Sequence, residues 1–194
     1  MKRTHFFLIF VMIIVSCDKS GEDHNYPTYI TAGQSVGPGI WYIDIEPDDT
    51  LKIIDCVETP HTERDLDLNH DGIMDFRLEY KVSRCDALGG SWNYLGIVPL
   101  GNNSICVSRE VSSWAEALYC NDTINENNTW SDSTALLFEH LFYITVGPVY
   151  DYGYWPQDTD IFVAVKIVRG EHSFYGWIDI NKKILRQYAI SIPY

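Results

Sequence analysis

The sequence predicts an all-β protein, a β-sandwich or jelly roll with few short helices. Short segments rich in β-branched and aromatic residues recur between polar and glycine-containing stretches, as they do in antiparallel sheets. Phe76, Leu78, Tyr80 and Val82 alternate with charged residues, which is the period of two expected of a strand with one buried face. The long amphipathic helices that an α/β fold needs are missing from the pattern.

Individual elements can be predicted from the same pattern. The expected strands cover residues 40–45, 51–54, 76–82, 161–168, 174–180 and 184–192. Residues 112–119 are expected to form a short helix capped by a serine. Residues 134–146 are apolar enough for either a helix or a strand.

The first residues have the pattern of a bacterial export signal. Lys2 and Arg3 precede an apolar run over residues 6–15, which is too short to span a bilayer, because a membrane helix needs about 20 apolar residues. The run ends in Ile-Val-Ser-Cys at Cys17, which resembles a bacterial lipobox. That resemblance implies cleavage before Cys17, attachment of lipid to its thiol and anchoring in a membrane. The alternative is an ordinary secretory signal with a chance cysteine.

This interpretation divides the chain into a lipoprotein signal peptide at residues 1–16, a lipidated cysteine with a flexible tether at residues 17–38, and one β-sandwich domain at residues 39–194. The acidic residues after Cys17 resemble a surface-export signal of Bacteroidetes, although Asp18 by itself resembles an inner-membrane retention signal of enterobacteria. We therefore expect a lipid-anchored protein of the cell envelope, held in the outer membrane and facing the surface.

The mature chain is strongly acidic. Removal of residues 1–16 takes away Lys2 and Arg3 and leaves 12 basic residues against 27 acidic ones. The clustered Lys and Arg that phosphate binding requires are missing, so nucleic acid is not an expected partner. The expected partners are a membrane, through the lipid anchor, and a glycan or another surface protein.

The cysteines other than Cys17 predict disulfide bonds, because they are even in number and an oxidising compartment preserves such bonds. The short loop between Cys106 and Cys120 favours their pairing, which leaves Cys56 with Cys85. The other connectivities stay open. A zinc site is the alternative, but no pair has the C-x-x-C spacing.

One segment carries metal-binding chemistry. Residues 67–75 read D-x-N-x-D-G-x-x-D, which places oxygen-bearing side chains on alternate residues of a tight loop. Calcium prefers about six to eight oxygen ligands of this kind. The expected ligands are Asp67, Asn69, Asp71, the carbonyl of Ile73 and Asp75, completed by Asp65, a distant residue or water. The alternative is a solvated acidic turn leading into a strand.

The loop resembles the calcium loops of EF-hands, dockerins and thrombospondin type 3 repeats, although Leu78 stands where an EF-hand has its last glutamate. With the later segment His172-Ser-Phe-Tyr-Gly-Trp177, it resembles a family of uncharacterised secreted and lipoprotein domains from Bacteroidetes. That family combines a D-x-N-x-D-G-x-x-D-F strand entry with a terminal H-Y-G-W strand. The resemblance implies a β-sandwich and export, and it brings no known activity.

Two functions are compatible with these features. The first is a calcium-stabilised structural or binding module for a glycan or protein, and the second is a hydrolase acting on an extracellular polysaccharide. Tyr150, Tyr152, Tyr154 and Trp155 crowd one loop, where rings stack on sugars or cover the end of a sandwich. No catalytic residue is assigned, because G-x-S-x-G, H-E-x-x-H and P-loop motifs are missing and sequence does not show carboxylate pairs.

Overall fold

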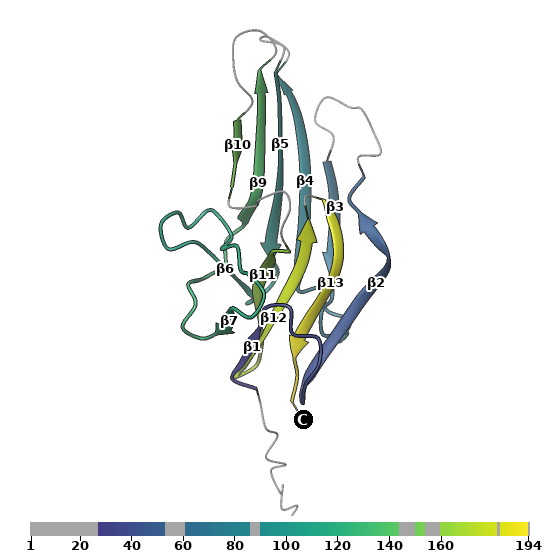
Figure 1. Cartoon of the computed structure of the whole chain (residues 1–194), viewed down its shortest axis with the longest axis vertical. Coiled ribbons are helices and arrows are strands. Elements are labelled where there is room, and N and C mark those ends of the chain that lie inside the picture. The colour runs from purple at the N-terminus through teal and green to yellow at the C-terminus, as the bar shows by residue number, and fades with distance from the viewer. Residues whose placement is uncertain are drawn as a thin grey trace, which may run out of the picture.

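The computed structural model describes residues 27–52, 61–85, 90–143, 150–153, 160–181 and 183–193. These residues form an all-β fold in which two antiparallel sheets make two layers, accompanied by a short separate pair of strands (Figure 1). Within these ranges there is no helix. The prediction of an all-β sandwich is confirmed.

The first sheet has five strands, in the order β10 (Tyr150–Tyr152), β9 (Ala135–Tyr143), β5 (Gly90–Pro99), β4 (Phe76–Cys85) and β3 (His61–Leu66). The second sheet has six strands, in the order β2 (Ile40–Thr50), β13 (Ile184–Ser191), β12 (His172–Asn181), β11 (Phe162–Arg169), β6 (Ser104–Cys106) and β8 (Trp130–Ser131). The separate pair consists of β1 (Tyr29–Thr31) and β7 (Thr123–Asn125). The expected strands at residues 40–45, 76–82, 161–168, 174–180 and 184–192 correspond to β2, β4, β11, β12 and β13.

The main core lies between the two sheets. Alternate residues of β4 and β11 point into it, and Phe76, Leu78, Val163 and Val165 are all completely buried there. The intervening residues of β4 are charged, and Arg77 pairs with Asp65 on the outer side of the sheet. The alternation in the sequence therefore identifies the buried face of β4 correctly.

A second, smaller core covers the outer face of the six-stranded sheet. Trp177 of β12 and Phe162 of β11 pack edge to face, with 5.0 Å between ring centroids. Ile30 of β1 and Ile124 of β7 are completely buried against this face. The indole N–H of Trp177 donates a hydrogen bond to the carbonyl oxygen of Gln34 at 3.1 Å. Burial on both faces explains why the residues of β11 before Lys166 form a continuous apolar run.

Close packing of β12 against β13 explains why the late Tyr-Gly-Trp motif has a glycine at position 176. A Cβ atom at this position in β12 would lie 2.5 Å from the carbonyl oxygen of Ala189 and 2.8 Å from Cδ1 of Ile190. Both atoms belong to the neighbouring strand β13, and both distances are well inside van der Waals contact. A side chain at this position would therefore push the two strands apart.

The expected tether over residues 17–38 is wrong in its described part. Residues 29–31 form β1, and Ile30 and Ala32 are buried in the second core. The reason is that the outer face of the six-stranded sheet carries large aromatic rings, which need an apolar cover. Residues 17–26 lie outside the described residues.

The expected helix over residues 112–119 is also wrong. This segment forms turns and isolated bridges, in which Ala115 pairs with Val107 and Leu118 with Phe162. Ala115 belongs to the main core and Leu118 to the second core, so the segment connects the two cores instead of presenting one helical face.

In its described part, the open choice at residues 134–146 resolves as the strand β9, which pairs with β5 along its length. Leu51 and Lys52 follow β2 outside any strand, and residues 53–54 lie outside the described ranges. Leu51 packs in the main core from its position just after β2.

Candidate functional site

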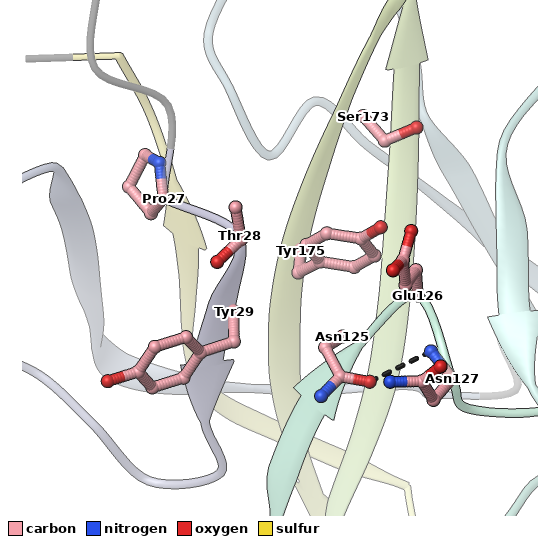
Figure 2. Close-up of a pocket in the computed structure, with 8 residues that line it drawn as sticks. All are labelled: Pro27, Thr28, Tyr29, Asn125, Glu126, Asn127, Ser173 and Tyr175. Atoms are coloured by element: carbon pink, nitrogen blue, oxygen red, sulfur yellow. Dashed lines mark hydrogen bonds between the residues drawn. The ribbon is translucent and has the colours of Figure 1, made fainter.

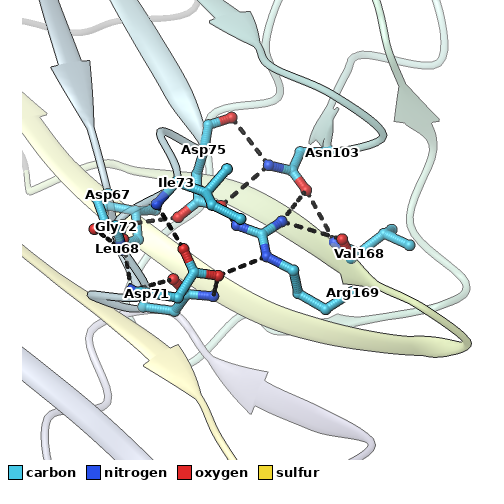
Figure 3. A network of polar contacts seen from close by, with 10 residues as sticks. Asp67, Leu68, Asp71, Gly72, Ile73, Asp75, Asn103, Val168 and Arg169 are labelled. Atoms are coloured by element: carbon cyan, nitrogen blue, oxygen red, sulfur yellow. Dashed lines mark hydrogen bonds and ion pairs between the residues drawn. The ribbon is translucent and has the colours of Figure 1, made fainter.

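The predicted metal loop connects β3 to β4 and is organised by its own carboxylates. Asp67 accepts hydrogen bonds from the backbone N–H groups of Asp71 at 3.2 Å and Gly72 at 2.8 Å. Asp71 accepts one from the backbone N–H of Ile73 at 2.8 Å. Gly72 has a φ of 84°, a conformation that favours glycine. The spacing in the sequence therefore builds a tight turn with its acidic side chains folded onto its own backbone (Figure 3).

Asp75 is the buried end of this loop. Its side chain has no exposed surface and accepts hydrogen bonds from the backbone N–H of Leu68 at 2.8 Å and the side-chain amide of Asn103 at 3.2 Å. Nη2 of Arg169 lies 2.6 Å from its Oδ1 atom. Burial raises the pKa of Asp75, and the hydrogen bonds from Leu68 and Arg169 oppose that shift.

Arg169, the last residue of β11, joins the loop to the opposite sheet. Its Nε atom lies 2.7 Å from Oδ2 of Asp71, so one guanidinium bridges the carboxylates of Asp71 and Asp75 (Figure 3). The hydrogen bond from Arg169 is the main reason that the pKa of Asp71 is lowered. An arginine distant in sequence therefore supplies the positive charge inside this acidic loop.

His70 holds the same loop against two further strands of the six-stranded sheet. Its backbone has a φ of 55°, and its ring stacks on Trp41 of β2 with 5.1 Å between ring centroids. Its Nε2 atom lies 2.8 Å from the hydroxyl oxygen of Tyr188 in β13. The loop therefore contacts β2, β13 and β11, and it closes one end of the space between the sheets.

Asp65 and Asn69, the other predicted side-chain ligands, have partners within the protein. Asp65 lies in β3 with its carboxylate 2.6 Å from Nε of Arg77. Oδ1 of Asn69 accepts a hydrogen bond from the backbone N–H of Asp71 at 3.2 Å. Across the described ranges, no three His, Cys, Asp or Glu side chains surround a common point. Calcium binding stays a prediction, and hydrogen bonds and Arg169 organise the loop in this structure.

The expected bridge between Cys106 and Cys120 is absent, since both carry free thiols. Cys106 is held in β6 between β11 and β8, whereas Cys120 is exposed in a turn whose Asn121 N–H donates to the carbonyl of Ala32. Burial raises the pKa of the Cys106 thiol to about 11. Cys56 lies outside the described residues, and the backbone of Cys85 ends β4, so the other predicted pairing stays a prediction.

Several predicted residues fall wholly or partly outside the described ranges. Tyr150 and Tyr152 belong to β10, at the edge of the five-stranded sheet, whereas Tyr154 and Trp155 lie outside the described residues. Cys17 and the export signal also lie outside them. In the part of the chain that is described, no helix has the length and apolarity to cross a membrane.

The structure reveals an aromatic surface that the sequence interpretation missed. Trp92 and Tyr94 lie side by side on β5, with 4.7 Å between ring centroids, and both are half-buried. The indole N–H of Trp92 donates to a carboxylate oxygen of Glu139, and Nζ of Lys81 lies 5.7 Å from the centroid of the Tyr94 ring. The sequence signal for β5 is the alternation of polar and aromatic residues from Ser91 to Tyr94, which the sequence interpretation did not use.

No protein-family model, curated protein or solved structure matches the chain. The structure alone therefore defines the class of protein: an antiparallel β-sandwich with a short covering strand pair and an Asp- and Asn-rich loop that joins its two sheets.

Proposed function

We propose that this chain is an exported lipoprotein at the surface of the cell envelope, in which a calcium-stabilised β-sandwich serves as a structural or binding module for a glycan or protein. The observation that carries this proposal is the loop at residues 67–75, whose carboxylates bond to its own backbone and, through Arg169, connect the loop to the opposite sheet. A cation bound there would act on the packing of the whole sandwich.

The donor set of the loop suits a hard cation. The carboxylates of Asp67, Asp71 and Asp75, the amide oxygen of Asn69 and the carbonyl of Ile73 are the oxygen ligands that calcium prefers. Two of these carboxylates pair with the guanidinium of Arg169, so calcium has to compete with that charge. We therefore expect weak binding, with a dissociation constant of about 10⁻⁴ to 10⁻³ M, as in extracellular modules.

Thermal melting of the intact protein in a mild detergent tests this part of the proposal. At calcium about 100-fold above the dissociation constant, the folded state gains about 2.7 kcal/mol. For a domain of this size that corresponds to a rise in Tm of about 5 to 10 °C over the value in chelator. Asp67→Asn should abolish the rise, whereas Asp65→Asn, which changes a carboxylate paired with Arg77, should retain it. The same Tm in calcium and chelator would contradict the proposal.

Export is tested separately, by mass spectrometry of the protein from its native membrane. The expected product begins at Cys17 and carries fatty acids, and Cys17→Ser should remain unlipidated. A chain that begins at Met1 without fatty acid would contradict the lipoprotein assignment and leave the calcium loop to be judged alone.

A hydrolytic role gains no support from the loop. The pKa of Asp71 is lowered and that of Asp75 is raised, a difference that two catalytic carboxyls would also show. Asp75, however, is completely buried, and the guanidinium of Arg169 bridges it to Asp71. A substrate has no access to Asp75, so the geometry favours a structural role for the pair.

A further inference from the structure

A pocket of about 340 Å³ opens where β1, the turn after β7 and the start of β12 meet (Figure 2). Tyr29 of β1, Asn125 at the end of β7, the following Glu126 and Asn127, and Tyr175 of β12 line its walls. This volume lies at the lower end of the range of small-molecule sites, about 300 to 1,000 Å³. It suits the terminal one or two units of a longer molecule.

Tyr175 presents a buried phenol to this pocket. Its side chain packs in the second core against Trp130, with 5.8 Å between ring centroids, and only 7% of the residue is exposed. Its hydroxyl makes no hydrogen bond with any described residue, and the phenol forms part of the pocket wall. Burial and the charge of Glu126 raise the pKa of Tyr175, so the hydroxyl stays protonated at neutral pH. The packed ring therefore holds a hydroxyl donor at the pocket wall, where a ligand can accept its hydrogen bond.

The turn beside Tyr175 is held by its own hydrogen bonds and offers further polar groups. Oδ1 of Asn125 accepts a hydrogen bond from the backbone N–H of Asn127 at 2.8 Å, and Oδ1 of Asn128 accepts one from that of Asn125 at 2.8 Å. The indole N–H of Trp130 donates to the carbonyl of Asn125 at 3.0 Å. These bonds leave the side-chain N–H₂ of Asn125 and the side-chain amide of Asn127 available to a ligand. Such preorganisation lowers the entropy cost of binding.

The chemistry of the walls restricts the ligand class. The described lining contains the carboxylate of Glu126 and no Lys, Arg or His, so a phosphate or carboxylate group would be repelled. The polar groups around Tyr175 would be left without partners by a purely apolar ligand. Tyr29 exposes 57% of its surface beside them, and an exposed ring of this kind packs on the C–H face of a sugar. Hydroxyl groups match the amides, the carboxylate and the phenol.

We propose that this pocket binds a neutral saccharide, with Tyr175, Asn127 and Glu126 hydrogen-bonded to its hydroxyl groups and Tyr29 packed on its ring. None of the described lining residues belongs to the predicted aromatic cluster at residues 150–155 or to the calcium loop. The inference rests on the binding role proposed above and gives it a ligand class.

The test is a binding screen of the intact protein in mild detergent against an array of neutral, sialylated and amino-sugar oligosaccharides, followed by calorimetry with the strongest neutral hit. Tyr175→Phe keeps the ring and its packing but removes the donor, and it should weaken binding about three- to tenfold. Tyr29→Ala should weaken binding about tenfold. The matched controls are Tyr119→Ala, which removes another exposed ring, and Asn102→Ala, and both should bind as the wild type does.

Each outcome decides the inference. Neutral hits that weaken in both pocket variants and in neither control support it. Binding of only sialylated or amino-sugar glycans, or neutral hits that Tyr175→Phe and Tyr29→Ala leave unchanged, overturn it while preserving a binding role elsewhere on the protein. A silent array overturns the inference and the glycan role together, and the calcium-dependent Tm then still reports on the structural role by itself.

Discussion

Replacement of Arg169 by methionine removes the guanidinium that neutralises the buried carboxylate of Asp75 while it keeps most of the apolar stem. Asp75 then retains only the backbone N–H of Leu68 and the amide of Asn103 as partners. The charge has no exposed surface through which water could replace the arginine. The variant is therefore expected to destabilise the junction between the two sheets.

The magnitude follows from the burial of each partner. Removing one member of a buried ion pair costs about 3 to 5 kcal/mol. The side chain of Arg169 is 27% exposed and Asp75 keeps two donors, so the lower end of that range applies. The pair with Asp71, which is 32% exposed, adds at most about 1 kcal/mol. We expect Arg169→Met to lower the free energy of unfolding by about 3 kcal/mol.

Urea denaturation followed by tryptophan fluorescence measures this loss. The matched control is Arg77→Met, which breaks a pair with Asp65 of the same 2.6 Å length on the solvent side of β4 and should cost much less than Arg169→Met. Combining Arg169→Met with Asp75→Asn should recover part of the loss, because no buried charge then lacks its partner. Equal effects of the two arginine variants, or strict additivity in the double variant, would refute the reasoning.

Three further outcomes are expected. Gly176→Ala should destabilise the fold by about 1 to 3 kcal/mol in urea, whereas Gly96→Ala, where a Cβ meets only ordinary contacts, should be close to neutral; equal effects contradict the close approach in β12. Iodoacetamide at pH 8 should modify Cys120 and leave Cys106 unmodified until the protein unfolds. The reason is that Cys106 is buried and its pKa of about 11 leaves roughly one thiol in a thousand as thiolate. Equal labelling rates of the two cysteines would contradict the burial of Cys106. The ion pair that lowers the pKa of Asp71 should stabilise the fold above about pH 4, and acidification through the lowered pKa should remove that contribution. On acidification, the urea midpoint of Asp71→Asn should therefore fall less than that of the wild type. Equal falls in the two proteins would contradict this prediction.

The fold was predictable where residues follow a simple period. The alternation from Phe76 to Val82 marks β4 and its buried face, and the apolar run of residues 161–168 marks β11. β3, by contrast, reads His-Thr-Glu-Arg-Asp-Leu and has no apolar alternation, because it is an edge strand with most of its side chains in solvent. β1 was missed for a different reason: its one buried isoleucine has its partners in β7 and β12, far along the chain.

The candidate site was predictable only in its local part. The spacing of Asp67, Asp71 and Gly72 specifies a tight turn, since those residues bond to one another. Arg169 gives no such signal, because it reaches the loop only after β11 has packed in the opposite sheet. The pocket at Tyr175 is likewise formed by elements that meet only in the folded protein.

Isothermal titration of calcium into the chelator-treated, intact protein tests most directly whether residues 67–75 form a cation site. The expected result is one saturable site with a dissociation constant of about 10⁻⁴ to 10⁻³ M that disappears in Asp67→Asn and persists in Asp65→Asn. No saturable binding, or binding that Asp67→Asn leaves intact, would show that Arg169 alone neutralises the loop and that the module folds without calcium.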